Sequence, residues 1–536
     1  MSGAAEVTRA TQVAKAALTI PAAVRRAWQQ WPDDDAVVDG DTRLSWTGLA
    51  DRMADVARAL AGSGIRSGDR VALWAPNSAE WIVAALGVYA AGAVLVPVNT
   101  RFKLGEGAQV LRIARVKMLF TVTDFLGTNY AEQLADDREL SRTMETVVLS
   151  GPPGHSTPWE QFLARGEDEP SREADIQADD VSDIVFTSGT TGLPKGAMLT
   201  HGASTRTYAS WSETVGLRHG DRYLVVYPFF HCAGLKSGIL ACILTGATVV
   251  PCPVFDVATV MKLVERERIS MLPGPPTLFQ SLLNADLGDT DRSSLRLSVT
   301  GAAVVPVELV REMRDRLGFS SVVTGYGLTE TTGTVSMCRH DDPIEIVATT
   351  SGRPIPGMAV RVVGADHVDA PAGTPGEVLV KGFAVMRGYF DDPAATAAVI
   401  SGDGWLRTGD VGVLDEAGNI RITDRIKDMF IVGGFNAYPA EIENRILDHP
   451  DVAQVAVVGV PDDRLGEVGC AFVIPRRGST TTAEELIGWC RAVMANFKAP
   501  RYVQLVEDLP LNASGKVVKF ELRTRAQRMV RGAVGG

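Results

Sequence analysis

The sequence predicts an α/β protein with a large N-terminal domain of layered α/β sheets plus a small β-barrel, and a small α+β C-terminal domain. Three observations support this prediction. In the first 300 residues, short apolar runs alternate with helix-length stretches, which is typical of parallel sheets covered by helices. From about Gly357 the pattern changes to short strands and turns, as in a small barrel. After Arg425 a compact mixture of strands and helices follows.

The strands of the N-terminal domain are expected where short apolar runs, rich in β-branched residues, occur between helix-length stretches. These runs lie at 70–74, 223–227, 247–250 and 297–300. Two later runs, each beginning with a glycine, predict strands of the small barrel at 376–382 and 418–422.

The C-terminal domain has its own start and stop signals. Thr482 with Glu485 forms a capping-box pattern that predicts a helix continuing through Met494. A strand is expected at 502–506, and a loop rich in Pro, Asn, Ser and Gly then ends in Lys516.

One apolar segment imitates a membrane span. Residues 81–98 carry no charge, but Asn77 and Glu80 have the spacing of a capping box, and Gly92 interrupts the run. The stretch before Pro97 is rich in β-branched residues. The sequence therefore predicts a helix, a glycine stop and a buried strand.

Length and charge restrict the function. The chain has 536 residues, too many for one core, and 46% of them are hydrophobic, enough to bury several domains. The formal charge is 53 − 64 = −11, which argues against general affinity for nucleic acid or anionic membranes. A phosphate site in this chain must therefore rely on local donors.

The cysteines and the N-terminus indicate a cytoplasmic protein. Six cysteines are scattered without a C-x-x-C pair or zinc spacing, so we expect reduced, mostly buried thiols. They are Cys232, Cys242, Cys252, Cys338, Cys470 and Cys490. Residues 1–20 include charged side chains and lack a sustained apolar core, so they do not form a convincing signal peptide.

The most informative segment is a glycine- and hydroxyl-rich loop that follows an apolar, strand-like run. It reads Thr187-Ser188-Gly189-Thr190-Thr191-Gly192-Leu193-Pro194-Lys195-Gly196. Glycines let several backbone N–H groups face one anion, the hydroxyls add donors, and Lys195 supplies a mobile positive charge. A flexible surface linker is the alternative, but the apolar entry and the Pro-Lys-Gly exit favour a phosphate site. The segment lacks the Gly-Lys-Ser/Thr ending of the usual P-loop, which disfavours a kinase or GTPase.

Two further clusters carry polar groups on glycine-containing turns. Residues 324–331 place the ring of Tyr326 and the carboxylate of Glu330 together, suitable for covering a base and holding Mg²⁺ beside nucleotide phosphates. A buried turn with a capping Glu is an equally good explanation of that cluster alone. Residues 405–410 offer Asp410 to a pair of ribose hydroxyls, although an Asp after Gly is usually only a turn residue.

Six segments, in order along the chain, resemble the core motifs of the adenylate-forming superfamily, which includes acyl-CoA synthetases, non-ribosomal adenylation domains and luciferases. They lie at 187–196, 325–330, 407–410, 424–428, 433–443 and 512–516, and the resemblance covers roughly residues 20 to 525. It implies a two-step ligase in which a carboxylate attacks the α-phosphate of ATP, pyrophosphate leaves, and a thiol captures the acyl-adenylate. The chemistry agrees, because such a reaction depends on positioning and cation placement rather than on a protein nucleophile.

The resemblance assigns roles to individual residues. Those expected to hold the pyrophosphate end of ATP are Thr187, Ser188, Gly189, Thr190, Thr191, Gly192 and Lys195. Those expected around the adenine are Gly301, Ala302, Ala303, Gly325, Tyr326 and Gly327. Thr329 would meet the α-phosphate and Glu330 would hold Mg²⁺. Asp410 and Arg425 would contact the ribose.

The resemblance also implies a mobile C-terminal domain. The N-terminal adenylation domain would span 1–425, and the mobile domain, with the catalytic Lys516, would span 426–536. Lys427 aligns with the hinge about which the small domain rotates between half-reactions. Lys516 would bridge the substrate carboxylate and phosphate oxygens. Coenzyme A would pass close to the backbone at Gly433, Gly434 and Phe435.

The acyl pocket is expected around an aromatic/His segment. His231 would lie near the substrate carboxylate as a catalytic residue, although a satisfied core histidine is the alternative. The expected lining is apolar, which favours a hydrophobic acid, and consists of Phe229, Phe230, Cys232, Leu235, Val304 and Val305. The segment most resembles actinobacterial acyl-CoA ligases, including one that acts on a steroid-ring-derived propanoate. Departures at Cys232, Ala233 and Leu235 leave medium-chain, cyclic and aromatic acids open.

Three functions remain open from the sequence. The first is an ATP-dependent acyl-CoA ligase that uses Mg²⁺ and coenzyme A. The second is a fatty acyl-AMP ligase that loads a carrier-protein phosphopantetheine. The third is a nucleotide-binding protein without ligase activity, against which the intact Lys516, Asp410 and Glu330 argue. Beyond small molecules, the expected partners are a second copy in a homodimer and a lysine acetyltransferase or deacetylase acting on Lys516.

Overall fold

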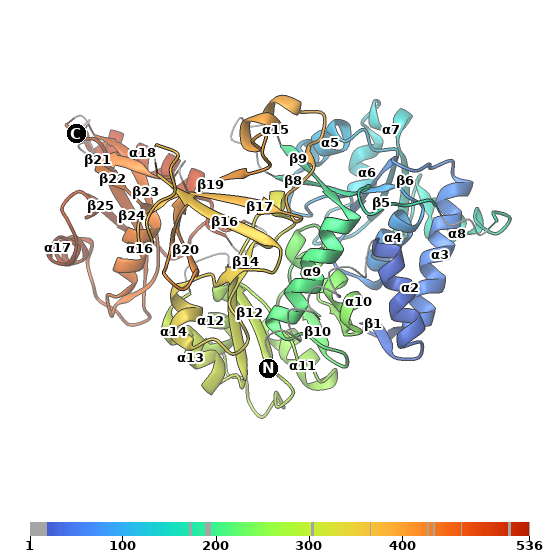
Figure 1. Cartoon of the computed structure of the whole chain (residues 1–536), viewed down its shortest axis with the longest axis horizontal. Coiled ribbons are helices and arrows are strands. Elements are labelled where there is room, and N and C mark those ends of the chain that lie inside the picture. The colour runs from blue at the N-terminus through green and yellow to red at the C-terminus, as the bar shows by residue number, and fades with distance from the viewer. Residues whose placement is uncertain are drawn as a thin grey trace. The chain divides into compact units, whose positions relative to one another are not determined.

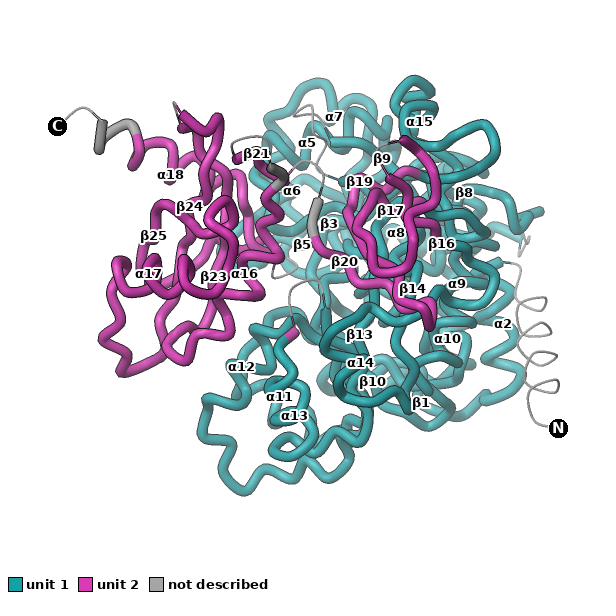
Figure 2. Tube along the Cα trace, turned by 60° about the vertical axis from the view of Figure 1, so that its left-hand side comes forward, with its two compact units in different colours: residues 1–301, 306–359, 380–406 teal, residues 302–305, 360–379, 407–536 magenta. Residues whose placement is uncertain are grey.

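A computed structural model describes residues 19–170, 174–187, 194–301, 305–364, 366–425, 428–432, 435–462, 464–512 and 516–534 (Figure 1). The chain divides into two compact units (Figure 2). Unit 1 consists of residues 1–301, 306–359 and 380–406, and unit 2 consists of residues 302–305, 360–379 and 407–536.

An eight-stranded sheet dominates unit 1, in the order β18-β9-β8-β4-β3-β5-β6-β7. Its strands are β3 (Arg70–Trp74), β4 (Val94–Pro97), β5 (Met118–Val122), β6 (Glu145–Ser150), β7 (Thr157–Pro158), β8 (Val181–Thr187), β9 (Lys195–Thr200) and β18 (Gly388–Tyr389). Strands β3 to β8 are parallel, whereas β9 pairs antiparallel with both β8 and β18. The predicted parallel α/β layering is confirmed.

Helices cover both faces of this sheet because neighbouring strand residues point to opposite sides. Leu119 of β5 packs in one core with α5 (Leu104–Ile113). The next residue, Phe120, makes edge-to-face ring contacts with Trp159 and Phe162 of α8 (Trp159–Ala164). Helices α2 (Ile20–Gln30), α3 (Trp46–Gly62) and α4 (Ala79–Ala90) pack against one another in the same unit.

Two four-stranded sheets complete unit 1. One has the order β10-β11-β1-β2, from β1 (Asp35–Asp39), β2 (Thr42–Ser45), β10 (Arg222–Val225) and β11 (Thr248–Pro251). The other has the order β12-β13-β14-β15, from β12 (Leu297–Gly301), β13 (Ser321–Tyr326), β14 (Ser336–Met337) and β15 (Arg353–Pro354). Met271 bridges them by pairing with both Tyr223 and Leu297.

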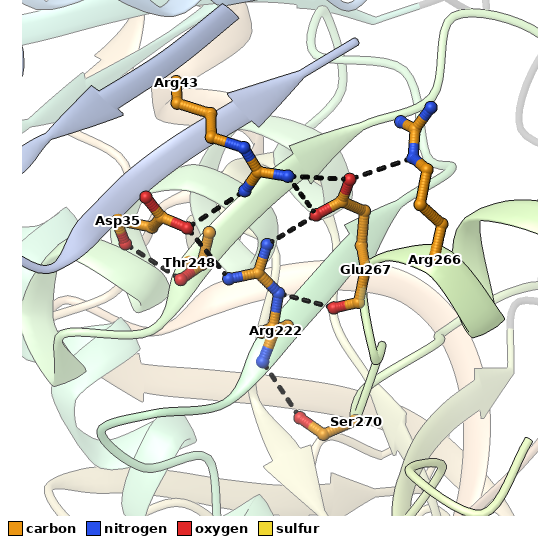
Figure 3. Close-up of polar contacts among 7 residues, drawn as sticks. All are labelled: Asp35, Arg43, Arg222, Thr248, Arg266, Glu267 and Ser270. Atoms are coloured by element: carbon orange, nitrogen blue, oxygen red, sulfur yellow. Dashed lines mark hydrogen bonds and ion pairs between the residues drawn. The ribbon is translucent and has the colours of Figure 1, made fainter. Parts of the chain in front are cut away.

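A buried carboxylate ties the first of these sheets to a helix end (Figure 3). Glu267, the C-cap of α11 (Val257–Arg266), binds the guanidinium groups of Arg43 at 3.0 Å and Arg222 at 2.8 Å. Burial alone would raise the pKa of Glu267, but these two arginines hold it below its ordinary value. Arg222 also reaches Asp35, so β1, β2 and β10 share one ion network.

The remaining helices of unit 1 connect these sheets. They are α6 (Tyr130–Ala135), α7 (Leu140–Thr143), α9 (His201–Val215), the π-helix η1 (Ala233–Leu240), α10 (Ala241–Thr245), α12 (Pro276–Asn284), α13 (Val307–Asp315), the 3₁₀ turn η2 (Thr329–Thr331), α14 (Ile344–Thr349) and α15 (Pro393–Val399).

Residues of unit 2 form most of a four-stranded sheet in the order β16-β17-β19-β20 and a separate α+β body. The sheet contains β16 (Met358–Val363), β17 (Gly376–Gly382), β19 (Leu406–Leu414) and β20 (Ile420–Arg425). The α+β body contains β21 (Phe430–Val432), β22 (Phe435–Ala437), α16 (Pro439–Leu447), β23 (Val452–Asp462), β24 (Gly466–Pro475), α17 (Ala483–Val493), β25 (Tyr502–Leu505) and α18 (Lys519–Val534). Thr482 and Glu485 form the predicted capping box of α17.

The uncharged 81–98 segment folds as predicted, with one correction. Helix α4 ends before Gly92, whose φ is +71°, and β4 follows. The N-cap is Ser78, whose hydroxyl accepts the N–H of Trp81, and not Asn77. Asn77 is buried, and its side chain binds groups far away in the sequence. Among the described residues no helix is long and apolar enough to span a membrane.

All six cysteines are buried and free, as expected for reduced thiols. Burial raises the pKa of the Cys232 thiol to about 12, although Lys236 opposes the change. Cys232 is therefore protonated at neutral pH and does not offer a competing nucleophile.

Candidate active site

The two ends of the predicted phosphate loop are held as a hairpin. Strands β8 and β9 pair antiparallel, with Thr187 opposite Lys195, and the Thr187 hydroxyl donates to the Lys195 carbonyl at 3.5 Å. Thr187 and Lys195, which flank the predicted phosphate loop, are therefore held opposite each other. The predicted phosphate-binding residues Ser188, Gly189, Thr190, Thr191 and Gly192 lie outside the described residues.

Tyr389 joins the two charged groups of this region. Its hydroxyl donates to Oε1 of Glu330 at 2.8 Å, and its ring centroid lies 5.3 Å from the Lys195 ammonium. Burial and then the Glu330 carboxylate raise the pKa of Tyr389 well above its ordinary value, so its hydroxyl keeps its proton. The structure thus gathers Lys195 and Glu330, which the sequence predicted separately, around a residue that it missed.

Glu330 is fixed through its backbone as well as its side chain. It lies in η2, which two residues separate from β13, and its carbonyl accepts the N–H of Met386 at 2.8 Å. Met386 lies two residues before β18, and Tyr389 of β18 pairs with Ala197 of β9. The hairpin that carries the phosphate loop and the turn that carries Glu330 are therefore attached to the same short strand.

These residues fit a magnesium ion of the kind predicted. Among the described residues no group of three His, Cys, Asp or Glu side chains could form a metal cage. Within the described part of the chain Oε1 of Glu330 accepts the Tyr389 hydroxyl, and Oε2 accepts no hydrogen bond. One oriented carboxylate, completed by phosphate oxygens and water, is a normal magnesium environment. The ion would neutralise charge on those phosphates.

Two adjacent parallel strands carry, at or next to their carboxyl ends, glycines that were predicted around the adenine. Gly301 ends β12 and lies opposite Gly325 of β13, and Tyr326 ends β13. A Cβ atom on Gly325 would lie 2.0 Å from Sδ of Met337, so only glycine fits there without a shift of Met337. A Cβ on Gly327 would lie 2.3 Å from a backbone carbonyl oxygen. The carboxyl ends of parallel strands are common ligand sites; Ala302 and Ala303 lie outside the described residues.

The side chain of Asn77 makes hydrogen bonds to the backbone of the loop that carries His231. The Asn77 side-chain amide donates to the carbonyls of Val225, Tyr227 and Cys252 at 3.0–3.2 Å, and its oxygen accepts the N–H of Phe229 at 2.8 Å. These bonds fix the backbone two residues before His231. The sequence offered no local sign of this role, because the partners lie about 150 residues away in the chain.

His231 has a defined ring orientation. Its Nδ1 accepts the N–H of Ala233 at 3.2 Å, so the neutral ring carries its proton on Nε2. A Cβ on Gly234 would lie 2.2 Å from the Pro228 carbonyl oxygen, which shows how tightly the loop is folded. The π-helix η1 begins at Ala233, and π-helical turns often occur at functional sites.

A buried ion pair lies one turn beyond this loop. The Lys236 ammonium of η1 binds Oδ2 of Asp183 on β8, and both side chains are at most 1% exposed. Asp183 also accepts the hydroxyls of Ser182, at 2.5 Å, and Tyr89. The strand that leads into the phosphate loop is thus bonded to the helix that follows His231.

Unit 2 carries the predicted ribose and lysine residues. Asp410 is buried on β19, where its backbone pairs with Arg425 of β20, and its N–H donates to the Thr408 hydroxyl at 3.0 Å. The Asn512 N–H donates to the Lys516 carbonyl at 2.7 Å, and the Lys516 N–H donates to the side-chain oxygen of Asn512 at 2.9 Å. Phe435 begins β22, opposite Val432. Lys427, Gly433 and Gly434 lie outside the described residues.

Comparison with known proteins identifies the family of this chain. A model of the AMP-binding enzyme family matches residues 24–390, and a model of the AMP-binding enzyme C-terminal domain matches residues 441–516. The chain belongs to the AMP-binding enzyme family.

Similar curated proteins of this family are CoA ligases. A Rhodococcus jostii ligase for a 7a-methyl-1,5-dioxo-octahydroindenyl propanoyl group is 47% identical over 517 residues, covering 94% of this chain and 98% of that protein. A ligase of the same name from Mycobacterium tuberculosis is 46% identical over 510 residues, with the same coverage. Feruloyl-CoA synthase from an Amycolatopsis species is 38% identical over 504 residues, again covering 94% and 98%.

Solved structures of related ligases share the fold. ATP-bound MatB from Rhodopseudomonas palustris superposes with a TM-score of 0.85 at 29% identity, covering 95% of this chain and 99% of MatB. The anthranilate CoA ligase AuaEII, solved with anthranoyl-AMP, superposes with a TM-score of 0.86 at 26% identity, covering 96% and 98%.

These comparisons confirm the predicted family, fold class and enzyme class. The chain is an ATP-dependent, AMP-forming acyl-CoA ligase that uses Mg²⁺ and coenzyme A. They favour free CoA over the carrier-protein alternative, and a nucleotide-binding protein without ligase activity is excluded.

Proposed function

We propose that this ligase activates a propanoate side chain carried on an alicyclic, oxygen-bearing ring system. The observation that carries the proposal is the likeness to two ligases, 47% and 46% identical over almost their whole length, that act on a dioxo-octahydroindenyl propanoyl group. The apolar surroundings of His231, with Phe229, Cys232 and Leu235 buried, support a hydrophobic acid.

In this proposal the residues of unit 1 have separate roles in the first half-reaction. Lys195 and the loop before it grip the departing phosphates, while Glu330, oriented by Tyr389, holds the cation. Thr329 meets the α-phosphate, and the glycine-ended strands with Tyr326 receive the adenine. His231, which carries its proton on Nε2, orients the substrate carboxylate. Fixed donors and cations of this kind stabilise the charge that develops in phosphoryl transfer.

Unit 2 contributes the ribose contacts and the catalytic lysine in this proposal. Asp410 and Arg425 bind the ribose hydroxyls, and Lys516 bridges the carboxylate and phosphate oxygens. A domain boundary after Arg425, with Lys427 as hinge, lets the 426–536 domain rotate so that Gly433, Gly434 and Phe435 guide the pantetheine arm. The two hydrogen bonds between Asn512 and the backbone of Lys516 support a defined role for that lysine.

The proposal extends to partners and location. A cytoplasmic enzyme, a homodimer, and control by a lysine acetyltransferase and deacetylase at Lys516 are all consistent with a ligase of this type. Acetylation would remove the positive charge on which the first half-reaction depends.

A panel of acids with ATP, Mg²⁺ and CoA tests the substrate assignment, with the product thioester identified by its mass. The panel contains 3-cyclohexylpropanoate, a bicyclic dioxo-octahydroindenyl propanoate, octanoate, ferulate and malonate. We expect the highest kcat/KM for the bicyclic propanoate and measurable turnover of cyclohexylpropanoate. Preference for octanoate or ferulate by tenfold or more would defeat the alicyclic assignment while leaving the ligase activity intact.

A further inference from the structure

Lys236 is a buried lysine next to the acyl region. It is 0% exposed, and it follows Cys232 by four residues, about one helical turn, so the two side chains lie on the same side of η1. The Lys236 charge is close enough to oppose the rise in the pKa of Cys232.

The ammonium is only partly satisfied by the protein. Within the described part of the chain the ammonium donates one hydrogen bond, to Asp183, and the Tyr89 ring centroid lies 5.5 Å away. An ammonium has three N–H donors, and a buried donor without an acceptor is unfavourable. Asp183 balances the charge of Lys236 but leaves donor capacity for another oxygen.

The surroundings leave a small space beside these groups. A cavity of about 10 Å³ is lined by Lys236, Tyr89 and otherwise only by apolar side chains, among them Leu86 and Leu240. Space of this size is about what one oxygen-sized atom occupies. Leu240 follows Lys236 by four residues, so Cys232, Lys236 and the cavity are arranged in sequence along one side of the helix.

We propose that Lys236 is a specificity-determining residue of the acyl site, where its ammonium donates a hydrogen bond to a ring carbonyl oxygen of the acid. The proposal rests on the proposed function and refines it: the enzyme selects the oxygen on the ring and not only the hydrophobic shape. A site that hydrogen-bonds a substrate group rejects the analogue without it, because the buried donor is then left unpaired.

The test compares 3-cyclohexylpropanoate with its 2-oxo, 3-oxo and 4-oxo ring derivatives, using kcat/KM from pyrophosphate release. For the wild-type enzyme we expect one oxo acid to exceed the parent acid by roughly tenfold or more. In Lys236→Met, which keeps the length and removes the charge, that ratio falls to about one to three. The control Lys117→Met removes an ion pair with Asp69 from a half-exposed lysine and keeps the wild-type ratio.

Two results would overturn the proposal: no oxo acid better than the parent in the wild type, or an unchanged ratio in Lys236→Met. The first needs no variant, so poor folding of Lys236→Met does not remove the test, and Lys236→Met/Asp183→Asn provides a second neutral form. If cyclohexylpropanoate is turned over without oxo preference, only the role of Lys236 fails. If no acid in either panel releases pyrophosphate, the proposed function fails and the proposal fails with it.

Discussion

Tyr389 donates its phenolic hydrogen to Glu330 at 2.8 Å while its ring faces the Lys195 ammonium at 5.3 Å. One side chain thus fixes the distance between the expected magnesium ligand and the lysine of the phosphate loop. The hydrogen bond leaves Oε2 of Glu330 for the cation and restricts how the carboxylate can turn. Orientation by such outer contacts commonly tunes a metal ligand.

Tyr389→Phe should therefore weaken magnesium use more than it weakens folding. A hydrogen bond to a charged group contributes about 1.5–3 kcal/mol, so we expect the first half-reaction to slow by roughly 10- to 100-fold at limiting Mg²⁺. The half-saturating Mg²⁺ concentration should rise several-fold, and the retained ring should keep KM for the acid unchanged. Pyrophosphate release at varied Mg²⁺ measures both effects.

The matched control is Tyr130→Phe, which removes a tyrosine hydroxyl bonded to the Thr100 carbonyl at 2.7 Å elsewhere in unit 1. It should leave the Mg²⁺ dependence unchanged. Equal Mg²⁺ curves for wild type and Tyr389→Phe would show that Tyr389 only packs against its neighbours.

The contrast between Tyr389 and the phosphate loop shows what the sequence can predict. The glycines, hydroxyls and lysine of the phosphate loop are close together in the sequence at 187–196, so local patterns reveal them. Local patterns also predict strands with sustained apolar runs, and the predicted bounds of β3 and β17 match the structure. Tyr389 lies in a two-residue strand, which is too short to give a periodic signal. Its partners come from β9 and the turn after β13.

Asn77, in contrast, was noticed in the sequence but was given the wrong role. Its spacing to Glu80 matched a local capping pattern, but the cap is formed by Ser78. The amide of Asn77 instead donates hydrogen bonds to carbonyls of the His231 loop. A buried amide needs such partners, but the residues next to Asn77 in the sequence do not show where the partners lie. Local rules therefore predicted the helix correctly and misassigned the residue that connects it to the site.

Lys516→Ala should separate the two half-reactions. Adenylation, measured as acid-dependent pyrophosphate release, should fall by 10²- to 10³-fold or more, as when other charge-stabilising donors are removed. Thioester formation from supplied acyl-adenylate and CoA should stay within a few-fold of wild type, because the proposed mechanism gives Lys516 no part in that step. Comparable losses in both half-reactions would falsify this assignment.

Asp183→Asn should destabilise unit 1 strongly. It leaves the buried Lys236 ammonium without a counter-charge, and breaking one side of a buried ion pair costs about 3–5 kcal/mol. Lys236→Met/Asp183→Asn should recover part of that loss, since no buried charge remains unpaired. Urea unfolding of the wild type, both single variants and the double variant measures the coupling. An additive double variant would mean that the pair contributes nothing as a pair.

His201 should make the protein less stable in mild acid. The ring is 1% exposed, its Nδ1 accepts the N–H of Ile20 at 3.3 Å, and burial lowers the pKa of His201 to about 4. In the unfolded chain the pKa is about 6.5, so below that pH the unfolded chain binds a proton that the native protein does not. The stabilising contribution of the neutral ring is therefore complete above pH 6.5 and is lost as pH falls towards 4.

At pH 5 this single group accounts for a loss of about 2 kcal/mol relative to pH 8. His201→Asn keeps an acceptor for the Ile20 N–H but cannot titrate. Between pH 8 and pH 5 the free energy of unfolding of this variant should therefore fall by about 2 kcal/mol less than that of the wild type. The control His340→Asn replaces an exposed histidine and should retain the wild-type slope. Urea unfolding at each pH supplies the comparison. Parallel slopes for wild type and His201→Asn would mean that His201 takes up a proton in the native protein too, and that its burial gives the ring no preference for the neutral form.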